Sequence, residues 1–411
     1  MNKISKCRLS GSENLISVLN LGNQELTGVF PRSLTEKVTS GPLELVWSPD
    51  SGLLQLGCSF DLGEMYGDNY GYRSGLNQSM VAHLSGKVAN LEKKYGLAAD
   101  DCVIDIGSND ATTLKAYATR GIKRIGVDPT GRKFQEFYTD GIKLIPDFFP
   151  TPELSVAIGN SKVKVVTSIS MFYDLEDPIA FARSVASVLD RNGIWHLEQS
   201  YMPSMIRMNS YDTICHEHLE YYSLHSIQYV MERAGLKVLD VQMNGVNGGS
   251  FALTVAHQDS AFLPNKAVID WLFVQELKMG FDTPAPFREF ETRVFAHRKA
   301  LRSLIEALNA DGKKVFGYGA STKGNVVLQF CKFTAKEIPF VAEINQDKFG
   351  AFTPGTHIPI ISDVEANAMQ PDYYLVLPWH FKDGIVRREQ KFLAAGGKLI
   401  FPFPEIEIVG G

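Results

Sequence analysis

Apolar runs alternate with amphipathic stretches over most of this 411-residue chain. From about residue 80, a helix-like stretch, MVAHLSGKVANLEKKY, precedes four apolar, β-branched runs: VIDIGSNDATTL, RIGVDPT, KVKVVTSISMF and GIWHLEQS. Strand-like runs separated by helical stretches are typical of a parallel sheet covered by helices. The pattern therefore predicts an α/β domain over residues 76–260.

A second series of apolar runs begins near residue 312 and comprises KKVFGYGASTKGNVVLQF, IPFVAEIN, YYLVLPW and KLIFPFP. This series predicts a second, Rossmann-like α/β unit. The charged, helix-favouring stretch from about 262 to 305 joins the two units, so we assign residues 261–411 to a helical linker plus the C-terminal domain. Residues 1–75 contain short segments broken by Gly, Pro and Ser, which predict a small, irregular, β-containing module.

Composition excludes several classes of protein. Hydrophobic residues make up 45% of the chain, charged residues 21%, and the net charge is −5, so we expect no nucleic-acid or membrane partner. The N-terminal stretch MNKISKCRLSGSEN lacks the apolar core of a signal peptide, and no apolar run reaches the roughly 18 residues of a membrane span. We therefore expect a cytoplasmic protein, with its five scattered cysteines reduced.

The first motif that indicates chemistry is the run from Val103 to Asp110, an apolar strand followed by an acidic and glycine-containing turn. Gly107 allows a ligand to approach the backbone closely at the carboxyl end of the strand. Asp128 follows the next predicted strand, where a carboxylate can accept hydrogen bonds from ribose hydroxyls. Together these features predict a nucleoside site, although a plain βαβ packing unit would show much of the same pattern.

The composition of this turn distinguishes between two nucleoside cofactors. A dinucleotide site offers three glycines to a pyrophosphate, whereas DIGSND offers one glycine and two carboxylates. Carboxylates repel a pyrophosphate but tolerate the sulfonium and ammonium groups of S-adenosylmethionine. The motif pair DIGSND and GVDPT resembles the cofactor site of class I S-adenosylmethionine-dependent methyltransferases.

This resemblance implies a set of cofactor-binding residues. Gly107 and Ser108 would line the methionine end, Asp128 would bind the ribose, and the stretch Asp147, Phe148 and Phe149 would face the adenine. The strand end around Ser170 and Met171 would form the floor near the methyl group. The remaining expected cofactor contacts are Asp105, Asn109 and Pro129.

More of the chain resembles a narrower group, the three-domain sugar C-methyltransferases that act on nucleotide-linked 4-keto-deoxy sugars. The N-terminal module, SYDTICHEHLEYYS, NGVNGGSF and GYGASTKGN occur in the same order in that family, and the resemblance covers nearly the entire chain. It implies a dTDP- or GDP-linked sugar substrate and a reacting centre at the HEH segment. The expected substrate-binding residues are Cys215, Tyr222, Asn247, Tyr318, Lys323 and His380.

The chain departs from this family at two places. Family members commonly hold zinc in the N-terminal module on two cysteine pairs, but the matching positions here are Cys7, Ser10, Ser48 and Ser51. Neutral hydroxyls do not replace thiolates as zinc ligands, so we expect no metal. A tyrosine usually precedes HEH, whereas this chain has Cys215, which leaves one tyrosine role unfilled.

The chemistry of C-methylation explains the cluster CHEHLEYYS. A carbon beside a ketone accepts a methyl group only after a base removes its proton, and histidine titrates near neutrality. We expect His218 to be the base, with Glu217 and His216 positioning it or a sugar hydroxyl, and Tyr70 or Tyr72 as an enolate partner.

Other interpretations of these residues stay open at this point. Two histidines at i and i+2 do not form the HExxH zinc motif, and they can instead satisfy local backbone groups. The tyrosines, Lys323 and His380 can be packing or solvated residues, although a glycine-rich turn at a helix start also suits a phosphate. Alternative functions are O- or N-methylation of a related sugar, or cofactor or sugar-nucleotide binding without catalysis.

Overall fold

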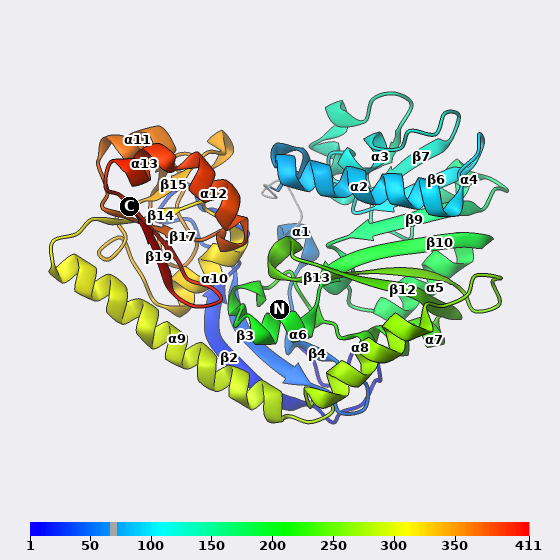
Figure 1. The fold of residues 1–411 in the computed structure, drawn as a ribbon, viewed down its shortest axis with the longest axis horizontal. Helices are drawn as coiled ribbons and strands as arrows, with labels where there is room; N and C mark the ends of the chain where they lie inside the picture. Colours follow the sequence, from blue (N-terminus) through cyan, green and yellow to red (C-terminus); the bar gives the residue numbers. More distant parts are fainter. Residues whose placement is uncertain (66–71, 411) are drawn as a thin grey trace.

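The computed structural model describes residues 1–65 and 72–410. Figure 1 shows two lobes side by side, the C-terminal lobe and the middle lobe, with the N-terminal strands running below and between them. The α/β class, with two Rossmann-like units and a β-containing N-terminal module, is confirmed. No helix in the described ranges is long and apolar enough to cross a membrane.

The middle lobe contains a seven-stranded sheet in the order β12-β13-β10-β9-β6-β7-β8. Its strands are β6 (Cys102–Ile106), β7 (Lys123–Val127), β8 (Lys143–Ile145), β9 (Val163–Ile169), β10 (Leu189–Ser200), β12 (Leu236–Asn244) and β13 (Ser250–His257). The four runs predicted as parallel strands form β6, β7, β9 and β10, which pair in parallel. The chain leaves β6 towards β7 on one side and returns to β9 on the other, so a ligand crevice is expected at the end of β6.

Helices cover both faces of this sheet (Figure 1). They are α2 (Gln78–Tyr95), α3 (Thr112–Lys115), α4 (Pro152–Ile158), α5 (Pro178–Val188) and α7 (Leu224–Arg233). Helix α6 (Met202–Arg207) instead buries its apolar side chains in a core with residues 43–47 of the N-terminal module. Helix α2 begins where the Asn77 side chain accepts a hydrogen bond from the Ser79 backbone, and it buries Met80, Leu84 and Val88. This four-residue spacing places one apolar face on the sheet.

The N-terminal module is organised around a four-stranded antiparallel sheet in the order β11-β4-β3-β2. The strands are β2 (Ile16–Glu25), β3 (Ser40–Trp47), β4 (Leu54–Leu56) and β11 (Glu220–Tyr221), with a separate pair of β1 (Asn2–Lys3) and β5 (Cys58–Ser59) and a short α1 (Leu62–Met65). Strand β11 comes from the middle of the chain, directly after the HEH segment. The N-terminal sheet therefore anchors that segment.

The C-terminal lobe contains a six-stranded sheet in the order β16-β15-β14-β17-β18-β19, parallel except for β19. The strands are β14 (Val315–Tyr318), β15 (Val341–Glu343), β16 (Ile360–Ser362), β17 (Tyr373–Val376), β18 (Lys398–Phe401) and β19 (Glu407–Gly410). Its helices are α10 (Thr322–Phe330), α11 (Asp363–Ala368), α12 (Lys382–Arg388) and α13 (Gln390–Ala394). The predicted linker helices are α8 (Lys266–Lys278) and α9 (Ala285–Ala310).

The N-terminal module and the C-terminal lobe share a hydrophobic core. Buried residues of β3, such as Leu45 and Trp47, belong to the same cluster as Phe287 of α9 and Val315 of β14. The middle lobe has separate clusters on its two sheet faces. The HEH segment lies where these cores meet, because Cys215 and Leu219 belong to the shared core.

Candidate active site

The turn after β6 requires glycine at its first position. Gly107 has a φ of +76°, a left-handed conformation that other residues rarely adopt. A Cβ atom there would also lie 3.1 Å from Cγ of Met171. The Gly107 amide donates to the carbonyl of Val127, 2.9 Å away, which ties the turn to β7. The backbone is thereby held open at the carboxyl end of the central strand.

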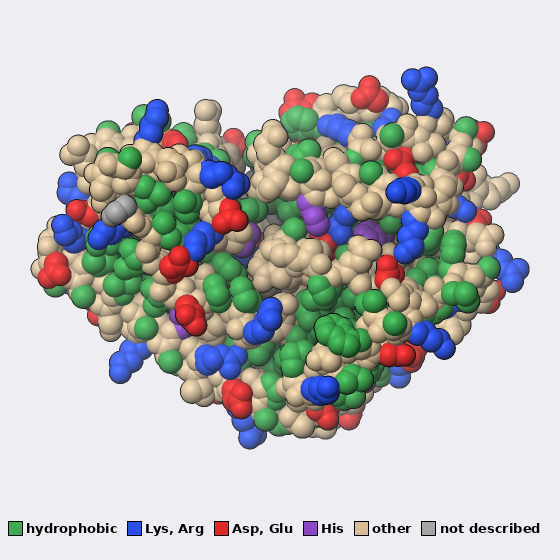
Figure 2. Space-filling model, viewed as in Figure 1, with side chains coloured by type: hydrophobic (Ala, Val, Ile, Leu, Met, Phe, Trp, Pro, Cys, Tyr) green, Lys and Arg blue, Asp and Glu red, His purple; other side chains and the backbone are tan. Residues whose placement is uncertain are grey.

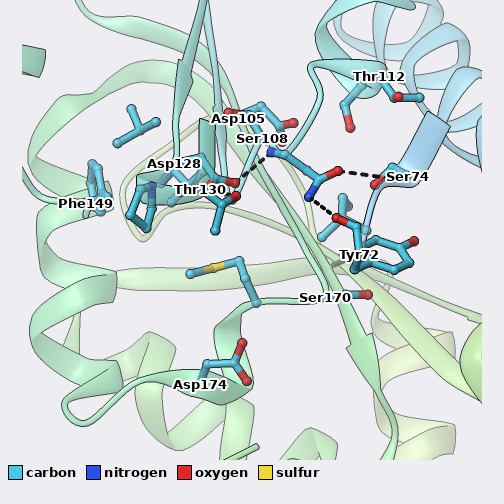
Figure 3. Close-up of a pocket in the computed structure, with 18 of the residues that line it drawn as sticks. Tyr72, Ser74, Asp105, Ser108, Thr112, Asp128, Thr130, Phe149, Ser170 and Asp174 are labelled. Carbon is cyan, nitrogen blue, oxygen red and sulfur yellow. Dashed lines mark hydrogen bonds between the residues drawn. The ribbon is translucent and has the colours of Figure 1, made fainter. Parts of the chain in front are cut away.

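Asp128 braces this turn from the end of β7. Its Oδ2 atom accepts a 2.7 Å hydrogen bond from the Asn109 amide, and its Oδ1 atom accepts from the amide and hydroxyl of Thr130 at 2.7 and 2.6 Å. Figure 3 shows the carboxylate between Ser108 and Thr130. A carboxylate has about four lone-pair directions, so one on Oδ2 remains for a ligand.

The cavity at the end of β6 is called the β6 pocket. One of its walls comes from the segment that precedes α2. The Asn109 side chain accepts from the Ser74 amide at 3.0 Å and donates to the Tyr72 carbonyl at 3.1 Å (Figure 3). The Gly75 amide donates to Asp110 Oδ2 at 2.9 Å. Residues 72–75 are therefore fastened across the turn. Tyr70, expected beside Tyr72, lies outside the described residues.

Most residues expected to bind the cofactor line the β6 pocket. They are Asp105, Gly107, Ser108, Asn109, Asp128, Pro129, Phe148, Phe149, Ser170 and Met171. Asp147 does not line it, because its carboxylate caps a turn by accepting from the Phe148 amide and the Thr151 hydroxyl. The sequence did not point to Ser74, Thr112, Thr113 or Asp174, which also line the pocket. The expected enolate partner Tyr72 is among the lining residues as well.

The electrostatics of the β6 pocket favour a cation. Asp105, Asp128 and Asp174 line it, and no lysine or arginine of the described chain does. Burial raises the pKa of Asp105 to about 7, against a 2.5 Å hydrogen bond from the Thr167 hydroxyl. An anionic pyrophosphate would meet carboxylates here without a compensating cation.

The pocket floor connects to the C-terminal lobe. Ser170 has a φ of +56°, and its amide donates to the Glu198 carbonyl at 2.7 Å. The Asn247 side chain donates to the Ser170 hydroxyl at 3.4 Å, and Lys323 donates from Nζ to the Asn247 carbonyl at 3.2 Å. A chain of contacts therefore runs from the floor to the first turn of α10 in the C-terminal lobe.

His218 is held in its neutral form. Its Nδ1 atom donates a 2.8 Å hydrogen bond to the Thr213 carbonyl, and because a carbonyl only accepts, Nδ1 carries the proton. The Nε2 lone pair has no hydrogen-bond partner among the described residues. Burial, and secondarily the Lys323 ammonium, lower the pKa of His218 to about 3. The ring packs edge-on against Tyr173, with centroids 4.3 Å apart.

Glu217 lies where the three domains meet. A Cβ atom at Gly28, in the N-terminal module, would fall 2.2 Å from its Oε1 atom and 3.6 Å from the Thr322 hydroxyl of α10. A side chain at position 28 would therefore displace the Glu217 carboxyl group from this place. Burial raises the pKa of Glu217 to about 7, so this group titrates near neutrality and can donate a hydrogen bond when protonated.

His216 contacts other residues than His218 does. It is 1% exposed and packs edge-on against Phe60 of the N-terminal module, with ring centroids 4.6 Å apart. Burial lowers its pKa to about 4. These contacts give His216 a packing role beneath the segment that carries Glu217 and His218.

Three residues expected to bind substrate are buried in protein contacts. Cys215 is fully buried in the core shared with the N-terminal sheet. Tyr222 is fully buried in the middle lobe, where its ring stacks on Phe172. The Tyr318 hydroxyl donates to Glu389 at 2.7 Å within the C-terminal lobe. These three side chains can therefore affect the substrate only indirectly, by positioning the residues that they contact.

The structure brings Lys323 and His380 together with Asp212 at the boundary of the lobes. Trp379 Nε1 donates to Asp212 Oδ2 at 2.7 Å. Burial, and then the Lys323 ammonium, lower the pKa of His380 to about 3. Burial raises the pKa of Asp212, and Lys323 opposes that shift. Asp212 was missed from sequence, although it stands six residues before His218 in the same motif.

A buried ionic cluster around Glu198, beside the Ser170 floor of the β6 pocket, was also not predicted from the sequence. Glu198 of β10 is 1% exposed and lies 2.6 Å from each of His83 Nε2, Lys87 Nζ and Asn244 Nδ2. The Glu198 carbonyl accepts from Ser170, so the cluster ties α2 to the pocket floor. His83 and Lys87 share a helix face at i and i+4, which is the only sequence signal for it.

The four positions that match zinc ligands form a hydrogen-bonded cluster. Cys7 Sγ lies 3.2 Å from the Ser51 hydroxyl, and the Leu9 amide donates to Sγ at 3.4 Å. Burial raises the pKa of the Cys7 thiol, but hydrogen bonds from Ser10 and then Ser51 outweigh it and leave the pKa lowered. One thiol with hydroxyl neighbours is not a zinc donor set, and no cluster of three ligand-type residues occurs elsewhere in the described chain.

Family models match three consecutive parts of the chain: a zinc binding domain over residues 7–66, a methyltransferase domain over 77–241 and a C-methyltransferase C-terminal domain over 245–404. The chain is also 30% identical over 413 residues to the C-methyltransferase NovU of Streptomyces niveus, covering 99% of this chain and 97% of that protein. The chain belongs to the S-adenosylmethionine-dependent C-methyltransferases. The serines at positions 10, 48 and 51 do not fit the zinc-binding description of its first domain.

Two solved structures are similar to just under half of this C-methyltransferase. The mitomycin 7-O-methyltransferase MmcR has a TM-score of 0.36 at 15% identity, over 44% of this chain and 55% of that one. The magnesium protoporphyrin IX methyltransferase ChlM of Synechocystis PCC 6803, solved with S-adenosylhomocysteine, has a TM-score of 0.34 at 17% identity, over 47% and 90%. The cofactor of this C-methyltransferase is S-adenosylmethionine.

Proposed function

We propose that this enzyme methylates the carbon beside the ketone of a nucleotide-linked 4-keto-deoxy sugar, at C-3, after His218 removes the proton from that carbon. The sugar carries dTDP or GDP. The proposal starts from the C-methyltransferase family of this chain. It adds three neighbouring features, which are His218 as the base, the β6 pocket for the cofactor and the region around Lys323 for the substrate.

In this proposal the β6 pocket holds the cofactor. Gly107 and Ser108 give the methionine end room, Asp128 keeps one lone pair for a ribose hydroxyl, and Phe148 and Phe149 offer apolar surface to the adenine. The lining carboxylates suit a cation. When bound, S-adenosylmethionine supplies an electrophilic methyl group to the nucleophilic carbon.

The observation that carries the proposal is a wall shared by the pocket and the base. Met171, Asp174 and Leu175 line the β6 pocket, while Tyr173 between them packs on the His218 ring. The Leu219 amide donates to the Tyr173 carbonyl at 2.8 Å, which fixes the HEH segment to this wall. A substrate carbon that reaches Nε2 of His218 therefore approaches the wall of the cofactor pocket.

The three side chains of the HEH segment have different roles in this proposal. His218 takes the proton on Nε2, because Nδ1 is occupied by the Thr213 carbonyl. Glu217, with its raised pKa, holds a sugar hydroxyl by donating or accepting a hydrogen bond. His216 keeps the segment in place from the N-terminal side. Lys323 and His380 face the substrate from the C-terminal lobe, and Asn247 faces it from the loop after β12 in the middle lobe.

The test uses two probes, dTDP-4-keto-6-deoxyglucose and its GDP-linked counterpart. With S-adenosylhomocysteine in heavy water, the enzyme should exchange the proton at C-3 for deuterium in one of them. With S-adenosylmethionine, carbon-13 NMR of the product should show the new methyl group on carbon. Two results would overturn this proposal. One is a product with the methyl group on oxygen or nitrogen, and the other is cofactor binding without exchange or turnover on either probe.

A further inference from the structure

Lys323 crosses from the C-terminal lobe to the middle lobe. It lies in the first turn of α10, yet its Nζ atom donates to the Asn247 carbonyl at 3.2 Å in the loop after β12. No acidic oxygen of the described residues lies within 4.0 Å of it, and no second acceptor is found there. An ammonium group has three donors, so two stay available to a ligand.

The ammonium faces groups from three other elements. Asp212 from the turn before the HEH segment, Cys215 and His218 from that segment, and His380 from the loop after β17 all interact with it electrostatically. Figure 2 shows the face of the molecule hollowed between the two lobes, with histidine side chains exposed there. The Lys323 ammonium and the His218 ring therefore belong to one cluster of interacting groups where the lobes meet.

The contact with Asn247 also places the ammonium relative to the cofactor. The Asn247 side chain donates to the Ser170 hydroxyl at 3.4 Å, and Ser170 lines the β6 pocket. One residue thus separates Lys323 from the floor under the reacting methyl group.

Proton removal next to a ketone creates negative charge on the ketone oxygen. The low pKa of His218 makes its imidazolium a strong acid, so transfer to it proceeds only if the new charge is stabilised. A preorganised donor aimed at a developing oxyanion in a water-poor site is worth a factor of roughly 10² to 10³ in rate. Lys323 is the cation that meets this requirement in the cleft.

We propose that Lys323 is a catalytic residue that donates a hydrogen bond to the ketone oxygen and stabilises the enolate while His218 takes the proton. The C–H electron pair moves towards the ketone oxygen, the proton moves to Nε2 of His218, and Lys323 stays protonated throughout. This inference rests on the proposed enolate chemistry. It differs from a phosphate role, in which Lys323 would contribute to nucleotide affinity alone.

The experiment compares Lys323→Met and Lys323→Arg with Lys336→Met, an exposed lysine of the same lobe. At saturating dTDP-4-keto-6-deoxyglucose, Lys323→Met should lower the deuterium-exchange rate by roughly a hundredfold, and Lys323→Arg by less. Affinity for dTDP and for S-adenosylmethionine should stay unchanged in all three, which also shows that the variants fold. A tenfold loss of dTDP affinity with a normal saturated exchange rate would overturn the inference in favour of a phosphate contact.

A second readout needs no substrate. In carbon-13 histidine NMR titrations, the pKa of His218 should rise when Lys323 becomes methionine and should not move in Lys336→Met. An unmoved His218 pKa would show that the ammonium does not face the base and would overturn the inference. Absence of exchange by the unaltered enzyme on both sugar probes would instead count against the proposed function, so the two failures are distinguishable.

Discussion

The two Rossmann-like units of this chain brace the turn after their first strand in the same way. In the middle unit, Asp128 accepts from the Asn109 amide at 2.7 Å, and in the C-terminal unit Glu343 accepts from the Ala320 amide at 2.8 Å. Each acid stands at the end of the second strand of its sheet. The shared geometry follows from the same 3-2-1-4-5 strand order in both sheets.

The units differ in what occupies the crevice. In the C-terminal unit, Lys348 donates to the Ala320 carbonyl at 2.7 Å, lies 4.5 Å from the centre of the Phe30 ring and is attracted to Glu343. Pro378 packs where a Cβ atom at Gly319 would lie, 2.8 Å away. The middle unit leaves the corresponding space open as the β6 pocket. In both units, an acid at the end of the second strand thus braces the turn after the first strand. The units differ in the side chains beside that turn: Lys348 and Pro378 fill the crevice of the C-terminal unit, and the middle unit leaves it open.

The largest expected effect comes from His218, the proposed base beside the open unit. His218→Asn should lower both deuterium exchange and turnover by roughly 10² to 10⁴-fold while leaving S-adenosylmethionine affinity intact, because in the proposed reaction the imidazole acts on the sugar. His225→Asn, an exposed histidine of the same lobe, is the matched control.

Exchange assays in heavy water and isothermal titration check this prediction. His216→Asn should be milder in turnover, since its ring packs against Phe60. Near-normal turnover of His218→Asn would refute its role, whereas lost turnover with retained exchange would make it a positioning residue.

The comparison of the two acids can be tested directly. Asp128→Ala should weaken S-adenosylmethionine binding by about 1.5 to 3 kcal/mol, roughly 10- to 100-fold, because a charge-assisted hydrogen bond is lost together with the brace. Glu343→Ala removes the equivalent brace in the other unit and should lower the melting temperature without changing that affinity. Equal affinity losses in both variants, measured by isothermal titration, would contradict the distinction.

Glu217 makes the junction of the domains sensitive to pH. Its folded pKa of about 7 lies above its usual value of 4.5, so its contribution to stability is complete below about pH 4.5 and is lost as pH rises through 7. Relative to Glu217→Gln, the unaltered enzyme should lose about 1 to 3 kcal/mol of unfolding free energy between pH 5 and 8. Urea unfolding of both proteins at several pH values measures this difference. A constant difference would show that the carboxyl group is not buried as described.

The smallest effect is expected in the N-terminal module. Because Cys7 has only serine hydroxyls at the matching ligand positions, purified protein should contain well under one zinc per chain. A chelator should change neither the melting temperature nor the activity. Stoichiometric zinc by elemental analysis would contradict the mapping of these four positions.

Sequence reasoning reached the parts of the site that depend on local pattern. A strand followed by Gly107, and a second strand followed by Asp128, each form from neighbouring residues, so periodicity and turn chemistry predicted these two positions. The resemblance to class I methyltransferases implied the other eight expected residues that line the pocket. The acidic turn likewise predicted a pocket suited to a cation. These features need no knowledge of distant contacts.

The rest depends on contacts between residues far apart in the chain. Whether Cys215 and Tyr222 face substrate or core depends on β11 pairing with β4, about 165 residues earlier. The Asn109 side chain donates to the Tyr72 carbonyl, and the Glu198 carboxylate contacts the His83 ring, so each contact links two elements that are distant in the chain. No periodicity within one element carries that information, because the partner is selected by tertiary packing.

Fastening residues 72–75 to the turn after β6 affects how this protein can be recombined with its relatives. A chimera joined at residue 76 would take its pocket turn from one parent and the facing wall from the other, so the Asn109 amide would meet a backbone that evolved against a different partner. A fragment beginning there would bind its cofactor in a groove with one side missing. A productive junction upstream of α2 must therefore precede residue 72 and keep the wall and the turn from a single parent.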